Sequence, residues 1–328
     1  MDEKDQFKVI IVGGSVAGLT LAHCLQRAGI EHVVLEKSAE LSPQVGASIG
    51  ILPNGARILD QLGLYDAVDD VTEPLSTAYI SYPDGFSFRS SYPRIIKERF
   101  GYPIAFLDRQ KFLEILHTSY PKSSNIHTSH RVTNIRRAKS RIEVVTDAGT
   151  TFTGDLVVGA DGVHSIVRSE MWKLDSRLVS SREKNSMTVD YACVFGISSA
   201  VPGLETGDQV NAFYDGLTIV TIHGKNGRVF WFVIQKLDRT YTYPDTVRFS
   251  NADADRLCQK IANFPLIKDI TFGHVWERKE VVSMTALEEN IFNTWHCDRV
   301  VCLGDSIHKV SSTARMNGRS TSNNLRNN

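Results

Sequence analysis

Two segments nearly 300 residues apart share one pattern, and together they constrain the fold of this chain. Val9–Gly18 and Val300–Asp305 each begin with an apolar, β-rich run and end in a glycine turn. Runs that are apolar throughout are typical of parallel strands covered on both faces. A third turn of this kind, Gly159–Ser165, follows the expected strand 155–158. Three strand-end turns predict one long dinucleotide held along its length, which favours flavin chemistry.

The first turn has the context of a nucleotide-binding unit. Gly13 and Gly18 hold the outer positions of a G-x-G-x-x-G turn, between an expected strand at 7–12 and an expected helix at 20–28. Ser15 replaces the middle glycine; it is small, and its hydroxyl can donate to a phosphate. The alternative is an ordinary strand–turn–helix without a ligand.

Glu36 ends the next apolar run, 32–35. This is about twenty residues after the turn, where such folds place a carboxylate that accepts hydrogen bonds from ribose hydroxyls. A carboxylate would repel a 2′-phosphate. Glu36 therefore favours the adenosine of FAD or NAD over that of NADP.

Composition excludes several classes of protein. The formal net charge is zero and no long basic stripe is present, which argues against a nucleic-acid partner. The charged start predicts no signal peptide, and no apolar run reaches the roughly 18 residues of a membrane span. The five cysteines lack metal-ligand spacing and are expected to be reduced thiols, with no metal site. These features predict a cytoplasmic protein.

The fold class expected is α/β, with a Rossmann-like FAD-binding domain interleaved with a β-sheet substrate domain. The FAD-binding domain is expected to comprise 1–75, 101–185 and 286–328, and the substrate domain 76–100 and 186–285. Closely spaced β runs predict an antiparallel wall over the cofactor. The expected elements are strands at 188–197, 210–214, 218–223 and 229–235, a strand hairpin in 76–100, two strands around the turn 147–149, and helices at 54–62, 108–120 and 252–263.

Five stretches recur together in the order and spacing of one enzyme family. They are Gly13–Gly18 with Glu36, Gly46–Gly55, Leu107–Arg109 with Phe112, Gly159–Ser165 with Arg168, and Trp295 with Arg299 before Gly304–Lys309. As a set they resemble the single-component FAD-dependent monooxygenases of aromatic-hydroxylase type. Within that class they are similar to fungal epoxidases of secondary metabolism, of the paxilline and meroterpenoid type.

The resemblance implies roles for individual residues. Glu36 would bind the adenosine ribose, Asp305 the ribitol, and Arg109 the phosphate or ribityl region, unless Arg109 is a solvated surface residue. Asp161 would touch the pyrophosphate, with a helix N-cap as the alternative, and Gly50 would allow close backbone approach. The implied cofactor-binding residues are Gly13, Ser15, Gly18, Glu36, Gly50, Arg109, Asp161, Asp305 and Gly318.

The resemblance also implies an activity. NADPH or NADH would dock transiently and reduce FAD, and one oxygen atom of O2 would enter an apolar, polycyclic terpenoid or meroterpenoid-type substrate by epoxidation or hydroxylation. No stable protein partner is implied. Aromatic residues of the expected β wall suit such a substrate, and Tyr214 is the catalytic candidate, as a hydroxyl donor in an apolar pocket.

The C-terminal stretch departs from the family pattern. Relatives continue with a glycine-rich turn and a longer C-terminal part, whereas here Arg315 and Asn317 stand at glycine positions before the polar tail 320–328. This predicts a truncated or frame-shifted product, with low soluble yield, substoichiometric FAD and NAD(P)H oxidation that leaks to hydrogen peroxide. Membrane association is expected only through a missing C-terminal segment.

Two alternative functions stay open. One is a non-catalytic remnant that binds FAD weakly. The other is an NAD-dependent dehydrogenase. It is less favoured because such an enzyme does not need the paired turns at Asp161 and Asp305, which this sequence contains.

Overall fold

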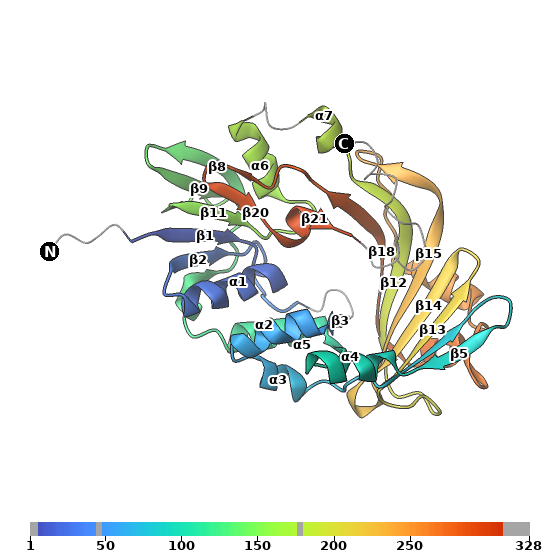
Figure 1. Ribbon diagram of the computed structural model, residues 1–328. Helices are drawn as coiled ribbons and strands as arrows, with labels where there is room; N and C mark the ends of the chain where they lie inside the picture. Colours follow the sequence, from blue (N-terminus) through green and yellow to red (C-terminus); the bar gives the residue numbers. More distant parts are fainter. Residues whose placement is uncertain (1–5, 44–47, 176–179, 311–328) are drawn as a thin grey trace.

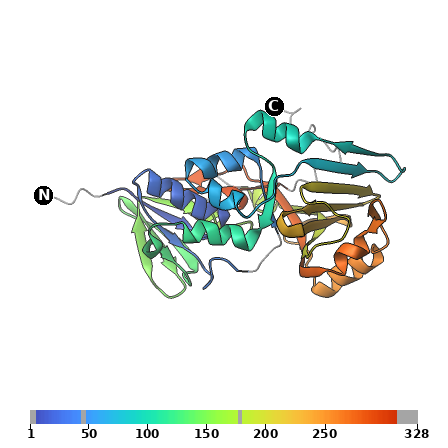
Figure 2. The ribbon, with the colours of Figure 1, turned by 90° about the horizontal axis from the view of Figure 1, so that it is seen from below.

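The computed structural model describes residues 6–43, 48–175 and 180–310. Two parts lie side by side, a mainly parallel sheet with helices and a larger, mainly antiparallel sheet (Figure 1). The same division is visible from below (Figure 2), where the N-terminal strand and the last helices lie at opposite ends of the molecule. The α/β fold class with two interleaved parts is confirmed.

The six-stranded sheet has the order β19-β20-β11-β1-β2-β7. All neighbouring pairs are parallel except β19 with β20. Because β11 lies between β1 and β20, the carboxyl ends of these three strands meet at one edge. The bounds are β1 Lys8–Val12, β2 Glu31–Leu35, β7 Ile126–His127, β11 Leu156–Gly159, β19 His296–Cys297 and β20 Val300–Cys302.

Both faces of β1 are covered, which explains why its sequence is apolar throughout. Val9 and Ile11 pack on the side of helix α1, whereas Ile10 and Val12 pack toward α6 and the three-stranded sheet β10-β9-β8. The bounds are α1 Val16–Arg27, α2 Pro53–Gln61, α3 Tyr65–Asp69, α5 Arg109–Thr118, α6 Ile166–Leu174, β8 Val132–Ala138, β9 Arg141–Thr146 and β10 Thr151–Gly154. β11 lies at the strand expected at 155–158, and the stretch before it holds three strands, β8, β9 and β10, where two were expected around the turn 147–149.

The eight-stranded sheet has the order β21-β18-β12-β15-β14-β13-β4-β5. Helices α8 and α9 cover one face, where Trp231 and Phe272 are fully buried. The two-stranded sheet β3-β6 lies against the other face, through Phe106 and Phe232. The bounds are β3 Ser48–Ile51, β4 Thr77–Ser81, β5 Ser87–Ser90, β6 Ala105–Asp108, β12 Thr188–Ser198, β13 Asp208–Tyr214, β14 Leu217–His223, β15 Val229–Thr242, α8 Asn251–Lys260, α9 Phe272–Trp276, β18 Lys279–Ile291 and β21 His308–Lys309.

Two details differ from the expected organisation. The hairpin in 76–100 is followed by helix α4, Tyr92–Phe100, which was not expected. The boundary expected at residue 286 falls inside β18, which is one continuous strand. The remaining short elements are η1 Ser123–Asn125, α7 Ser181–Lys184, η3 Lys225–Gly227, β16 Pro265–Ile267, β17 Ile270–Thr271 and η4 Gly304–Ser306. Within the described ranges, every helix is too short or too polar to cross a bilayer.

Candidate cofactor-binding site

A cavity of about 1000 Å³ opens at the edge where β1, β11 and β20 end. The three glycine turns expected from the sequence come together there. Their contributions are Gly13–Ala17 from the first turn, Ala160–Gly162 from the second, and Gly304 with Asp305 from the third. Strands far apart in the sequence therefore build one site, because the parallel order places their carboxyl ends side by side.

Close packing between the turns requires glycine at two positions. Gly13 has φ +110°, and a Cβ there would lie 2.4 Å from the carbonyl oxygen of Ala160. A Cβ on Gly18 would lie 1.8 Å from the carbonyl oxygen of Gly13. Since ordinary contact begins at 3.4 Å, neither position accepts a side chain without backbone movement. The first turn is thus held against the second by backbone contact.

The carboxylate of Glu36 is oriented by the backbone. Oε2 accepts a hydrogen bond from the Gly14 N–H at 2.7 Å, and Oε1 accepts one from the Ser38 N–H at 2.8 Å. Each oxygen keeps a further lone pair. Glu36 also lines the cavity. The arrangement leaves acceptor capacity beside the glycine turn, as the binding of ribose hydroxyls requires.

Arg109 joins three parts of the site. It opens α5, and its guanidinium donates a hydrogen bond to Ser15 Oγ at 2.7 Å. Burial lowers the pKa of Arg109, and the nearby charge of Asp305 opposes that effect. Asp305 also pairs with Lys309 Nζ at 3.1 Å. Arg109 therefore lines the cavity and is not a solvated surface residue.

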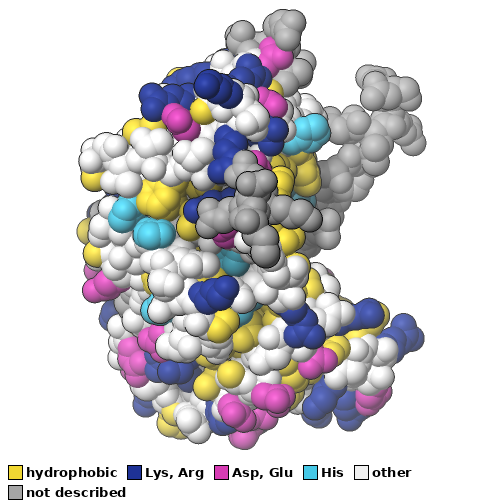
Figure 3. Space-filling view, turned by 90° about the vertical axis from the view of Figure 1, so that its left-hand side faces the viewer, with side chains coloured by type: hydrophobic (Ala, Val, Ile, Leu, Met, Phe, Trp, Pro, Cys, Tyr) yellow, Lys and Arg dark blue, Asp and Glu magenta, His cyan; other side chains and the backbone are white. Residues whose placement is uncertain are grey.

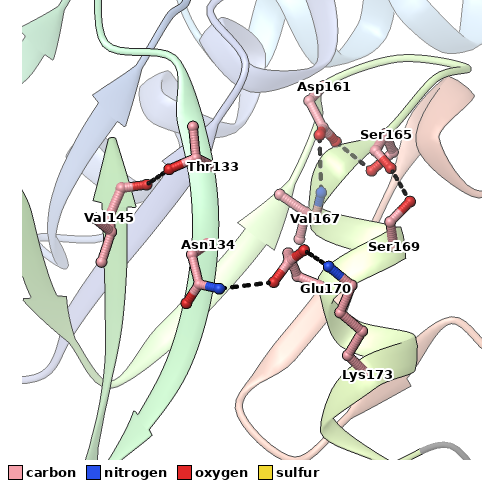
Figure 4. Close-up of polar contacts among 9 residues, drawn as sticks. All are labelled: Thr133, Asn134, Val145, Asp161, Ser165, Val167, Ser169, Glu170 and Lys173. Carbon is pink, nitrogen blue, oxygen red and sulfur yellow. Dashed lines mark hydrogen bonds and ion pairs between the residues drawn. The ribbon is translucent and has the colours of Figure 1, made fainter. Parts of the chain in front are cut away.

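Asp161 both lines the cavity and anchors a helix. Its carboxylate accepts from the Ser165 hydroxyl at 2.6 Å and from the Val167 N–H at 3.1 Å (Figure 4). Ser165 in turn caps α6 by accepting from the Arg168 N–H at 2.9 Å. Burial raises the pKa of Asp161, although these donors oppose the shift. The N-cap residue of α6 is thus Ser165 and not Asp161, whose carboxylate supports that cap and the first turn of the helix while it lines the cavity.

A buried arginine connects α6 to the third turn. The Arg168 guanidinium donates to the carbonyl oxygens of Ser306 and Val163 and lies 4.2 Å from the Phe292 ring centroid. Its pKa is lowered by burial. Arg168 therefore holds the second and third turns together and does not itself line the cavity.

The far end of the cavity was not expected from the sequence. His130, Arg131 and Thr133 line it, because the chain after β7 runs alongside the end of β2. The Glu36 N–H donates to the His127 carbonyl at 2.9 Å, and the His130 N–H donates to the Glu36 carbonyl at 2.8 Å. This pairing joins segments about 90 residues apart, and local sequence patterns carry no signal for it.

Two expected site residues, Gly50 and Tyr214, lie outside the lining of the cavity. A Cβ on Gly50 would lie 2.8 Å from the Phe106 ring, so Gly50 serves packing between β3 and β6, and its neighbour Ile49 lines the cavity. Tyr214 lies on the sheet face covered by α8 and α9, and its hydroxyl donates to the Pro265 carbonyl. That placement favours a packing role for Tyr214. Gly318, with Arg315 and Asn317, falls outside the described residues.

The donor and acceptor set fits FAD. Backbone N–H groups, the Ser15 hydroxyl and a guanidinium suit a pyrophosphate, and a fixed carboxylate suits a ribose. In the described part of the chain, no cluster of three or more His, Cys, Asp or Glu side chains could hold a metal ion.

Comparison with known proteins agrees with this geometry. Residues 6–316 match the family model described as an FAD binding domain. The FAD-dependent monooxygenase atmM of Aspergillus flavus is 75% identical over 315 residues, which are 95% of this chain and 66% of that protein. The FAD-dependent monooxygenase ptmM of Penicillium ochrochloron is 60% identical, over 94% of this chain and 74% of that protein. The chain thus spans about two thirds to three quarters of the length of these curated relatives.

Solved structures show the same fold at low identity. Klebsiella pneumoniae HpxO, crystallised with FAD and uric acid, has a TM-score of 0.73 at 20% identity, over 93% of this chain and 74% of that one. The p-nitrophenol 4-monooxygenase PnpA of Pseudomonas putida has a TM-score of 0.70 at 20% identity, over 93% of this chain and 74% of that one. On the family model and the high-identity relatives, the chain belongs to the FAD-dependent monooxygenase family.

Proposed function

We propose that this chain is the FAD-binding and substrate-facing part of a monooxygenase that inserts one oxygen atom from O2 into an apolar substrate. The observation that carries the proposal is the meeting of three glycine turns at one cavity beside Arg109 and Glu36. When bound, FAD would supply the transfer of electrons from NAD(P)H to O2.

Individual residues would hold the cofactor along its length. Glu36 would accept hydrogen bonds from the adenosine ribose, since its carboxylate is already fixed by two backbone donors. The backbone of the Gly13 turn, with Ser15 and Arg109, would hold the pyrophosphate. Burial lowers the pKa of Arg109 and the nearby charge of Asp305 opposes that shift, so the two side chains lie close together, and Asp305 would contact the ribityl chain.

The eight-stranded sheet would bind the substrate. One face of the sheet carries Phe195 and Phe232 and lies against β6. Strand β6 ends directly before Arg109, so this face is close in the chain to the cofactor site. The space-filling view shows a hollow in the right-hand outline of the molecule, with hydrophobic side chains on its wall (Figure 3). Such a wall suits an apolar, terpenoid or meroterpenoid-type substrate and keeps water from the reacting centre. The division into an FAD-binding and a substrate-binding domain is part of this proposal.

The reductant would be NADPH or NADH, docking transiently, because the sequence contains one nucleotide fingerprint and FAD would occupy it. The enzyme would work as a single component without a stable protein partner. The five cysteines are free thiols, four of them buried, which fits a reducing compartment such as the cytoplasm.

The test is a set of measurements on the purified chain. The visible spectrum should show flavin bands, NAD(P)H should be consumed only when O2 is present, and a product should carry oxygen from isotopically labelled O2. Release of hydrogen peroxide without product would identify an uncoupled enzyme. A yellow protein that does not oxidise NAD(P)H would identify a non-catalytic remnant. A colourless protein that reduces NAD without oxygen would refute the proposal in favour of a dehydrogenase.

A further inference from the structure

A single row of side chains crosses the eight-stranded sheet from β18 to β5. Directly paired residues of neighbouring strands share a face, so the strand register defines the row. Its members are Ser283, Phe195, Phe232, Val220, Asn211, Ile80 and Phe88. We call this set the sheet row. Apart from Ser283 on β18, its polar member is Asn211, which lies between two aliphatic neighbours.

The sheet row lies on the face that turns toward the nucleotide-binding part. Val220 and Phe232 belong to the cluster that also contains Phe106 of β6, and the rings of Phe106 and Phe232 are 6.4 Å apart. Alternate residues of β13, such as Ala212, pack instead under α8 and α9. The sheet row is therefore on the face where the proposed substrate would lie.

A chain of hydrogen bonds fixes the orientation of the Asn211 amide. The Tyr92 hydroxyl donates to Gln209 Oε1 at 2.9 Å, and Gln209 Nε2 donates to Asn211 Oδ1 at 2.8 Å. Since Oδ1 is thereby an acceptor, the other end of the Asn211 amide is its NH2 group. Tyr92 comes from α4 and holds this relay from outside the sheet.

The Asn211 amide nitrogen has no hydrogen-bond acceptor among the residues that the structure describes, although the residue is only 7% exposed. The described polar side-chain atoms that are sealed from solvent and unpaired are Ser48 Oγ, Arg168 Nε and Trp172 Nε1. The Asn211 NH2 group is not one of them, so it keeps some access to solvent. A nearly buried donor of this kind is costly to leave unpaired and selects for an acceptor.

We propose that Asn211 is a specificity-determining residue, whose amide donates a hydrogen bond to one acceptor oxygen of an otherwise apolar substrate. This inference rests on the proposed function and names its substrate class: an apolar ring system with a hydroxyl, ether or carbonyl oxygen placed over β13. The sheet row contains no charged residue, so the oxygen is that of an uncharged group.

The test compares three tricyclic probes with one carbon skeleton: cedrol, which carries a hydroxyl, its methyl ether, whose oxygen only accepts, and the hydrocarbon cedrane. Binding to the whole flavin-loaded chain is measured by equilibrium dialysis. The parent should bind both oxygen-bearing probes about tenfold more tightly than cedrane, the scale of one hydrogen bond. Equal binding of all three probes would overturn the proposal.

Two variants and a control locate the effect. Asn211→Leu should remove the preference for oxygen-bearing probes, because it should weaken the binding of cedrol and its methyl ether and leave the binding of cedrane unchanged. Asn211→Asp keeps the shape of the side chain but replaces the donor by an acceptor, so this variant should no longer bind the methyl ether more tightly than cedrane. It also provides the test if the leucine variant does not fold. Thr218→Val, a buried hydroxyl on the same face of β14, should keep the preference. A parent-like preference in Asn211→Asp would refute the assignment.

Flavin content and melting temperature are recorded for every variant. A variant of Asn211 that keeps the flavin content of the parent but no longer prefers the oxygen-bearing probes supports the role of Asn211. Absence of flavin from the parent itself would refute the proposed function. Flavin content is measured independently of the relative affinities for the probes, so the two failures can be told apart.

Discussion

Replacement of Gly13 by alanine tests whether backbone contact between two turns builds the cofactor site. A Cβ at Gly13 would lie 2.4 Å from the Ala160 carbonyl oxygen, and φ at this position is +110°. The backbone conformation should cost about 1–3 kcal/mol, and displacing the Ala160 carbonyl should cost about 1–3 kcal/mol more. Because Ala160 begins the second turn of the cavity, the displacement should also weaken FAD binding at least tenfold, or about 1.4 kcal/mol.

Gly29→Ala is the matched control. Gly29 also has positive φ, at +68°, but an added Cβ there meets nothing within 4 Å. It should therefore cost only the backbone strain, about 1–2 kcal/mol, and leave FAD binding unchanged. Both variants are compared with the parent by urea unfolding and by titration of the apoprotein with FAD. If Gly13→Ala matches Gly29→Ala in both measurements, the turn-to-turn contact does not build the site.

Three further changes probe other parts of the molecule. Glu36→Ala should weaken FAD binding by about 1–3 kcal/mol, since a charge-assisted hydrogen bond to the ribose is lost, and unchanged flavin retention would contradict this role. Arg109→Lys keeps the charge but loses the planar fork of donors, so FAD binding or reduction by NAD(P)H should fall; parent-like values of both would exclude a cofactor contact. His223 is buried, and burial lowers its pKa to about 4. The folded protein therefore binds this proton only at a lower pH than the unfolded chain, whose histidine titrates near pH 6.5. Its contribution to stability is fully present above pH 6.5 and should be lost as the pH falls toward 4, by about 3 kcal/mol; His223→Gln should flatten the unfolding free energy over that range, and an equally steep loss would refute the explanation.

Much of the nucleotide-binding part could be predicted because local pattern and burial coincide there. β1 and β2 begin within one residue of the expected positions, since strands covered on both faces are apolar throughout. Helix α4 was missed because the whole of 76–100 was assigned to a strand hairpin, although Pro93 lies in the first turn of the helix, where proline is well tolerated.

The candidate site was predictable where a motif fixes a residue, and not where a tertiary contact does. Glu36 and Arg109 line the cavity because each follows directly from a strand of the motif. Tyr214 was misplaced because both faces of β13 carry apolar residues, so alternation alone does not show which face α8 and α9 cover. His130 reaches the cavity through strand pairing that the sequence pattern does not encode.

The central place of β11 in the parallel sheet has a consequence for biosynthesis. β1 is made first, β11 joins it only after β2 and β7, and β20 adds its turn when nearly all of the described chain has left the ribosome. The pocket of a nascent chain therefore stays unfinished until β20 has been made. Flavin loading must be a late event, and shortening the chain before Asp305 should yield colourless protein even though the N-terminal fingerprint is intact.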